Sequence, residues 1–184
     1  MADISETRRD GGHRTFALTI AALVFAADQL VKYIVISVLR LPELPTRNIE
    51  LLPIFDLTWV ENRGVSMGFL VADSDAARWL LVALTAGIAA VVFFWMLREK
   101  NRGDTIALAF VLGGALGNIV DRARYGYVAD FADLHFGELR PFLIFNVGDA
   151  AITIGVLLLL FRALLTRDRK AAKAKDYPEG SNHA

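Results

Sequence analysis

The sequence predicts an all-α membrane protein with four transmembrane helices. Of its 184 residues, 55% are hydrophobic, and the mean hydropathy is +0.43. This apolar content exceeds the roughly 45–50% found in soluble domains. The apolar residues are gathered into four long runs, and a helix needs roughly 20 such residues to cross a bilayer. Four crossings would place both chain ends on the same side of the membrane.

Composition and motifs argue against several function classes. The chain has 20 basic and 20 acidic residues, so no net positive field attracts nucleic acid. It contains no cysteine, which excludes a thiol nucleophile, a disulfide and a thiolate metal site. The zinc-protease pattern HExxH and the serine-hydrolase pattern GxSxG are both missing from the sequence. We therefore expect no metal, no cofactor and no nucleic-acid partner.

The first helix is expected at about residues 15–39, after a polar tail of residues 1–14. A basic start, an apolar core and the small residues of Phe25-Ala26-Ala27 also resemble a cleavable signal peptide. However, the apolar run resumes at Leu30, and three more such runs follow. This pattern favours an uncleaved transmembrane helix.

Further helices are expected at about 76–97, 105–121 and 143–165, followed by a polar tail at 166–184. The third apolar run is short, so its polar end should lie near a membrane interface. In the loop 41–75, Phe55, Leu57 and Trp59 alternate with polar residues, as in a half-buried strand. In the segment 122–141, residues 127–136 could form a short extended arm. The whole chain is expected to form a single membrane domain.

Lysine and arginine predict the orientation. The two tails and the 98–104 turn together carry more of them than the loop 41–75 and the segment 122–141 do. Cytoplasmic segments are enriched in these residues. Both termini should therefore be cytoplasmic, and the loop and the arm should be extracytoplasmic.

Polar residues of three separate helices should meet at one depth. Asp28 lies 13 residues after Thr15, about 20 Å along the first helix at 1.5 Å per residue. This places it in the outer half of a hydrocarbon core about 30 Å thick. Asn118 and Asp121 are at the outer end of the third helix, and Asn146 and Asp149 are at the outer start of the fourth. The active region is thus expected toward the extracytoplasmic side.

Some of these charges have a partner nearby in the sequence. Asp28 and Lys32 are four residues apart and share one helix face, and Asp121 is followed by Arg122. Such pairs could simply hold helices together. Asp130 and Asp149, in contrast, have only apolar neighbours or glycine beside them in the sequence. They are the least compensated carboxylates.

Two uncompensated carboxylates at one water-accessible depth suggest an aspartic dyad. Like charges in close contact cannot both ionise readily, so such a pair holds one shared proton. The ionised member can accept a proton from an attacking water, and the protonated member can donate to the peptide carbonyl. The residues alone do not decide whether Asp130 or Asp121 is the partner of Asp149.

Five segments in this order resemble the bacterial lipoprotein signal peptidases, also called signal peptidase II. The segments are Asp28-Gln29-x-x-Lys32, Asn62-Arg63-Gly64-Val65-Ser66, Gly113-Gly114-Ala115-Leu116-Gly117-Asn118-x-x-Asp121-Arg122, Val128-Ala129-Asp130-Phe131 and Phe145-Asn146-Val147-Gly148-Asp149. The resemblance extends over nearly the whole length of the chain. The resemblance implies an aspartic endopeptidase that cleaves diacylglyceryl-modified prolipoproteins just before the lipidated cysteine, at the outer face of the bacterial inner membrane.

The resemblance also implies residue roles. It assigns catalysis to Asp130 and Asp149. It assigns substrate binding or support to Asp28, Lys32, Asn62, Gly64, Asn118, Asp121, Arg122 and Asn146. The loop with Phe55, Leu57 and Trp59 would form a small extracytoplasmic β-cradle over the substrate. Membrane lipids are the expected surroundings, and a monomer is the expected state.

Two positions depart from the family pattern. Gly148 stands where alanine is usual and should loosen the start of helix four slightly, and Met67 stands where an aromatic residue is common.

Two other functions have weaker support. A proton-coupled transporter could use Asp28, Lys32 and Asp149 as a relay, but a relay needs polar groups in both halves of the membrane. An assembly subunit could dock through the small-residue face of Gly113 and Gly117. His135 is interpreted as a surface residue.

Overall fold

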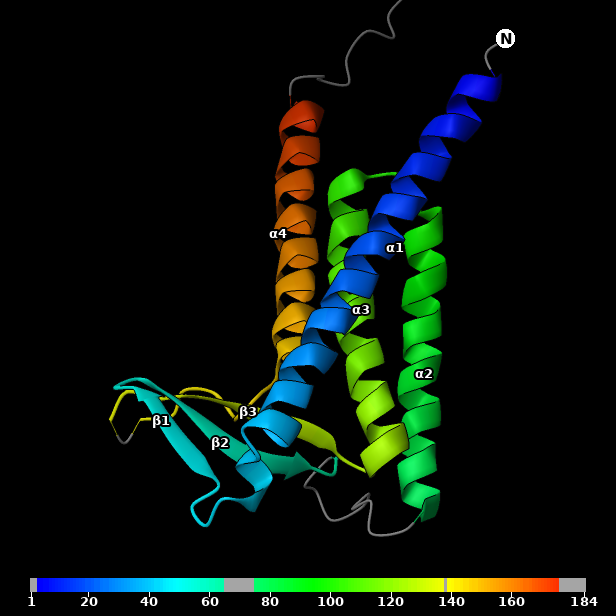
Figure 1. Ribbon diagram of the computed structural model, residues 1–184. Coiled ribbons are helices and arrows are strands. Elements are labelled where there is room, and N and C mark those ends of the chain that lie inside the picture. The colour runs from blue at the N-terminus through cyan, green and yellow to red at the C-terminus, as the bar shows by residue number, and fades with distance from the viewer. Residues whose placement is uncertain (1–2, 65–74, 138, 176–184) are drawn as a thin grey trace, which may run out of the picture.

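The computed structural model describes residues 3–64, 75–137 and 139–175, and side chains within 13–64, 75–137 and 139–165. Its four long helices are α1 (Asp3–Tyr33), α2 (Asp75–Arg98), α3 (Arg102–Tyr125) and α4 (Val147–Lys175). Each contains a stretch long and apolar enough to cross a membrane. A small sheet lies at one end of the helices (Figure 1). These elements confirm the predicted fold class.

Helix α3 is the centre of the bundle and packs against α1, α2 and α4. Small residues allow the close approach of its neighbours. A Cβ atom on Gly113 would lie 2.6 Å from the Ala21 carbonyl oxygen of α1, and one on Gly114 would lie 2.3 Å from the Gly148 carbonyl oxygen of α4. In a membrane, where burial of apolar surface gives helices little reason to associate, such close packing is a main source of stability.

The sheet contains β1 (Asn48–Leu52), β2 (Phe55–Asn62) and β3 (Val128–Leu134), antiparallel and in that order. Leu57, Trp59 and Phe131 are buried in a cluster that also contains Val35 and Leu41. Val35 belongs to a π-helical turn, η1 (Ile34–Val38), and Leu41 to a 3-10 turn, η2 (Leu41–Glu43), which carry α1 toward the sheet. The expected strand and the expected extended arm are therefore both present.

The start of α4 differs from the expected helix boundary. Helix four begins at Val147, and Leu143 is not helical. Phe145 instead pairs with β3, its N–H donating to the Ala132 carbonyl oxygen at 3.1 Å. The apolar run could not reveal this, because hydropathy does not distinguish a buried extended segment from a helix.

Three of the helices, α1, α3 and α4, extend beyond their apolar runs. Helix α3 continues to Tyr125 and ends at Gly126, whose φ of +83° suits glycine. Helices α1 and α4 extend into the polar tails, to Asp3 and Lys175. The expected bounds followed hydropathy, whereas the backbone hydrogen bonds continue into polar sequence.

Two glycines test the importance of close helix packing. Gly114→Ala should destabilise the protein by about 1–3 kcal/mol, because the added methyl group collides with backbone of α4. Gly87→Ala on α2 is the matched control. Nothing lies within 4 Å of its Cβ position, so it should be neutral or stabilising by up to about 1 kcal/mol. Thermal unfolding in detergent measures both, and equal shifts would contradict the packing argument.

Candidate functional site

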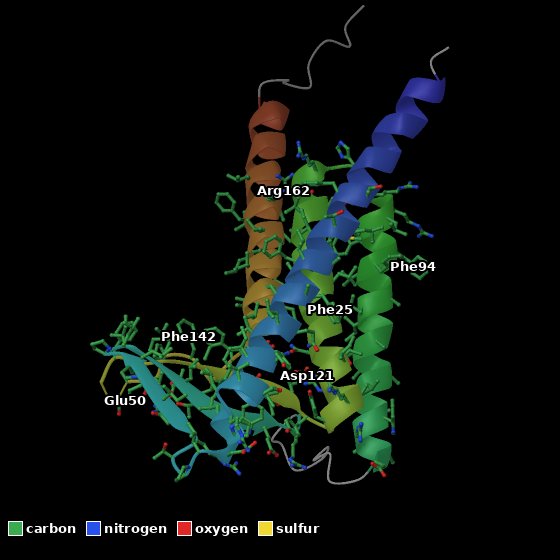
Figure 2. All side chains as sticks on the ribbon, viewed as in Figure 1. Phe25, Glu50, Phe94, Asp121, Phe142 and Arg162 are labelled. Carbon is green, nitrogen blue, oxygen red and sulfur yellow. The ribbon has the colours of Figure 1, made fainter. Side chains whose placement is uncertain are left out.

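A buried lysine joins α1 to α3. The ammonium of Lys32 lies 2.7 Å from Asp28 Oδ2, 2.7 Å from Asp121 Oδ2 and 3.1 Å from Asn118 Oδ1. All four side chains are buried, and Asp121 lies where α1 and α3 approach the sheet (Figure 2). The expected pair of Asp28 and Lys32 is present. The cation bound to Asp121 is Lys32 rather than its sequence neighbour Arg122, because tertiary packing brings α1 against this face of α3.

The same two carboxylates also position the neighbouring elements. Asp28 Oδ1 accepts a hydrogen bond of 2.8 Å from the N–H of Gly148 in the first turn of α4. Asp121 Oδ2 accepts one of 3.2 Å from the N–H of Ala129, the residue before Asp130. The buried ion cluster therefore fixes the backbone beside both candidate catalytic aspartates.

Gln29 is a member of this cluster that was not among the expected site residues. Its amide nitrogen lies 3.2 Å from Asp28 Oδ2, 3.2 Å from Asp121 Oδ1 and 3.4 Å from the Gly117 carbonyl oxygen. A glutamine beside an aspartate inside an apolar helix was the signal available in the sequence. Its bonds complete the set of donors around the two carboxylates.

Asn146 and Asp149 form a reciprocal cap at the start of α4. Asn146 Oδ1 accepts from the N–H of Asp149 at 2.9 Å, and Asp149 Oδ2 accepts from the N–H of Asn146 at 3.3 Å. This is the capping-box arrangement, which satisfies backbone donors that the first turn of a helix leaves without partners. It also holds the Asp149 carboxylate at the helix end nearest β3.

Asparagine amides connect Asp149 to Asp130. Asn146 Nδ2 donates to Asp130 Oδ1 at 2.6 Å, and Asn62 Nδ2 donates to Asp130 Oδ2 at 3.0 Å. Asn118 Nδ2 donates to Asp149 Oδ1 at 2.8 Å. Residues from β2, β3, α3 and the start of α4 thus converge on two carboxylates.

Gly64 and Arg122 border this arrangement. The Gly64 N–H donates to Asn62 Oδ1 at 3.2 Å, which orients the amide of Asn62 toward Asp130. Arg122 is close enough to interact electrostatically with Asp121, Asp130 and Asp149. Its Nε atom is buried and has no hydrogen-bond partner within the described part of the chain. The two aspartates that lack a cation nearby in the sequence therefore have one nearby in space.

The environment of Asp130 raises the pKa of its carboxyl group above the ordinary value. Burial, followed by the negative charge of Asp149, raises the pKa of Asp130 to about 6. The hydrogen bonds from Asn62 and Asn146 and the charge of Lys32 act in the opposite direction. Asp130 is 2% exposed, whereas Asp149 is only partly buried. Two neighbouring carboxylates in unequal surroundings can divide the roles of acid and base.

Three further expectations have different outcomes. His135, interpreted from the sequence as a surface residue, is partly buried: its side chain is 17% exposed and its Nε2 lies 3.3 Å from Asp56 Oδ2. Gly148 allows close packing, since a Cβ there would lie 2.9 Å from the Gly114 carbonyl oxygen. Met67 lies outside the described residues, as does Ser66. Among the described residues, no group of His, Asp or Glu is arranged to hold a metal ion.

Replacing the buried lysine tests the ion cluster. Lys32→Met keeps an unbranched side chain of similar shape but leaves Asp28 and Asp121 without their cation. It should destabilise the protein by about 3–5 kcal/mol. Arg40→Met is the control, because Arg40 and its partner Glu43 are exposed, and it should leave the unfolding temperature nearly unchanged. A wild-type unfolding temperature for Lys32→Met would show that the cluster contributes little to folding.

Comparison with known proteins identifies the family. Residues 20–165 match the family described as "Signal peptidase (SPase) II". The lipoprotein signal peptidase of Sphingopyxis alaskensis is 56% identical over 163 residues, which cover 89% of this chain and 92% of that protein. The corresponding enzyme of Rhizorhabdus wittichii is 57% identical over 158 residues, covering 86% of this chain and 91% of that protein.

Two solved structures of bacterial membrane enzymes share this fold. A bacterial membrane enzyme determined at 1.9 Å resolution superposes with a TM-score of 0.69 at 28% identity, covering 82% of this chain and 93% of that one. A second, determined at 2.3 Å, gives a TM-score of 0.68 at 25% identity and covers 92% and 94%. Together, the family match, the named relatives and the four apolar helices show a multi-pass membrane peptidase rather than a transporter or an assembly subunit. The chain belongs to the signal peptidase II family, whose members are lipoprotein signal peptidases.

Proposed function

We propose that this enzyme cleaves prolipoproteins with Asp130 and Asp149 as its catalytic dyad. The observation that carries the proposal is the double role of Asn146, which caps α4 together with Asp149 and donates to Asp130 at 2.6 Å. One side chain thereby holds both carboxylates in a single arrangement. Asp121 is the weaker candidate partner, because Lys32 and the N–H of Ala129 already occupy one of its oxygens.

The two aspartates would divide the proton transfers. Ionised Asp149 accepts a proton from water as the water oxygen bonds to the peptide carbonyl carbon, and protonated Asp130 donates its proton to the carbonyl oxygen. When the tetrahedral intermediate collapses, the C–N bond breaks and Asp149 gives its proton to the leaving amine. Asp130 recovers a proton from one hydroxyl group of the intermediate, and the oxygen of that group becomes the carbonyl oxygen of the new carboxyl group. The raised pKa of Asp130 supports its role as the acid.

Other polar residues would support this chemistry from two sides. We assign Asn62, Gly64, Asn118, Arg122 and Asn146 to the surface that contacts the substrate backbone and the dyad. Asp28, Lys32 and Asp121 are positioning residues, because their bonds go to each other and to the backbone next to the dyad. The aspartic pair needs no cofactor in this mechanism.

The substrate would be a prolipoprotein whose cysteine carries diacylglycerol, cut just before that cysteine. Its acyl chains would remain in the outer leaflet while the peptide lies between the sheet and the helices. The surface of the sheet end supports a position at the membrane boundary: Phe142 is 60% exposed, Leu143 91% and Leu52 59%. Phe142 lies on the side of the sheet facing the long helices (Figure 2). Exposed apolar side chains of this kind are typical of membrane contact.

We place the protein in the bacterial inner membrane as a monomer with both termini cytoplasmic. The basic turn between α2 and α3, with Arg98, Lys100 and Arg102, lies at the end of the helices opposite the sheet (Figure 1). The positive-inside rule assigns that end to the cytoplasm. The dyad then faces the extracytoplasmic side.

Single substitutions test the dyad. Asp130→Asn and Asp149→Asn should each lower kcat by at least about 100-fold, because each removes a proton donor or acceptor from the reaction. Asp121→Asn should retain measurable activity. The assay is cleavage of a purified diacylglyceryl-modified prolipoprotein in detergent, with mass spectrometry of the product locating the cut and unfolding curves checking that each variant is folded. Activity in folded Asp130→Asn together with none in folded Asp121→Asn would exchange their roles.

The pH dependence tests the assigned proton. The free enzyme should lose the shared proton of Asp130 as pH rises through about 6, so kcat/KM should decline above that pH. Asn62→Ala removes a hydrogen bond that favours ionised Asp130, and the decline should therefore move to higher pH. Thr58→Val is the control on the same strand, because its hydroxyl bonds to Asp133 instead. A decline that stays fixed or moves to lower pH in Asn62→Ala would contradict this assignment.

A further inference from the structure

A second charged region lies at the end of the helices away from the sheet. Two adjoining cavities, of about 310 and 50 Å³, share His13 in their lining. Arg102 lines the larger one, and Arg14, Arg98 and Lys100 line the smaller one. We call these four cations the basic cluster. It comes from α1, the end of α2, the α2–α3 turn and the start of α3, and none of its members belongs to the catalytic region.

Two acidic residues, Glu99 and Asp104, lie near the basic cluster. Glu99 lines the smaller cavity, but its Oε1 accepts from the N–H groups of Lys100 at 2.9 Å and Asn101 at 2.8 Å. Asp104 is paired with Arg162 at 2.6 Å. Among the side chains that the structure describes, the basic cluster forms no ion pair. Glu99 offsets one of the four positive charges, and the remaining net positive charge can attract an external anion.

An apolar groove lies on the same three helices, between the basic cluster and the catalytic region. Its volume is about 480 Å³, within the range of roughly 300–1,000 Å³ typical of ligand sites. Leu18 and Phe93 line it at the end near the basic cluster, and Phe25 and Ile119 at the other end. Leu18 and Phe25 are separated by about 10 Å along α1, at 1.5 Å per residue. Alanines such as Ala86 keep it open.

We propose that the basic cluster and the groove together bind one anionic phospholipid. The phosphate would lie among the arginines, and one acyl chain would occupy the groove between α1, α2 and α3. Basic pockets between transmembrane helices suit anionic headgroups. The apolar groove lies farther along the helices, in the direction in which the acyl chain of a bound lipid would extend. The diacylglyceryl group of a substrate fits less well, because it carries no phosphate and enters from the leaflet beside the sheet.

Lipid selectivity is the first test. Purified protein in detergent is titrated with dioleoyl phosphatidylglycerol, with dioleoyl phosphatidylcholine and with inorganic phosphate, and thermal unfolding is followed. Phosphatidylglycerol should raise the unfolding temperature, since a ligand bound only by the folded state stabilises it. The other two should have little effect. An equal effect of phosphatidylcholine would overturn recognition of the headgroup charge, and an equal effect of phosphate would show a simple anion site.

Matched variants locate the lipid. Arg98→Gln and Arg102→Gln should each weaken phosphatidylglycerol binding roughly fivefold, whereas Arg124→Gln, an exposed cation at the opposite end of α3, should not. Ala86→Phe fills the groove and should abolish the stabilisation. Val91→Phe is its control, because Val91 is 67% exposed and lies outside the groove. The site would be refuted if phosphatidylglycerol bound equally well to Arg98→Gln, Arg102→Gln and Arg124→Gln, whatever the result for Ala86→Phe.

Discussion

The Lys32 ammonium between Asp28 and Asp121 is the contact on which the rest of the site depends. A carboxylate buried without a cation is costly in a medium of low dielectric constant. With Lys32 in place, both carboxylates have a cation beside them and also accept the N–H groups of Gly148 and Ala129. The ion cluster that joins α1 to α3 therefore also fixes the backbone at the start of α4 and in β3.

Asn146 links this framework to the chemistry. Helix starts need side chains that accept backbone hydrogen bonds, and an asparagine with an acidic residue three positions later meets that need. Here the acidic residue is Asp149, and the amide nitrogen that capping leaves unused reaches Asp130. A requirement of helix formation therefore holds one proposed catalytic carboxylate beside the other. Substituting Asn146 would disturb the helix start and the dyad together.

The features predicted from sequence were those that depend on hydropathy and local spacing. Four apolar runs specified four helices, and the spacing of Asp28 and Lys32 indicated their pairing. What could not be predicted depended on tertiary contacts. The partner of Asp121 is on another helix, and Phe145 is extended because β3 offers it a hydrogen-bonded edge. Likewise, Gln29 becomes part of the site only when α1 packs against α3.

The two proposed catalytic aspartates lie on elements of different kinds, which constrains how the site can move. Asp149 belongs to a membrane-spanning helix, whereas Asp130 belongs to a strand of the sheet. The backbone bonds between Phe145 and Ala132 tie that strand to the chain just before α4. Movement of β1 and β2 to admit a substrate can leave this connection intact, but movement of β3 would separate the carboxylates. Substrate entry without loss of the dyad therefore requires β3 to stay with the helices.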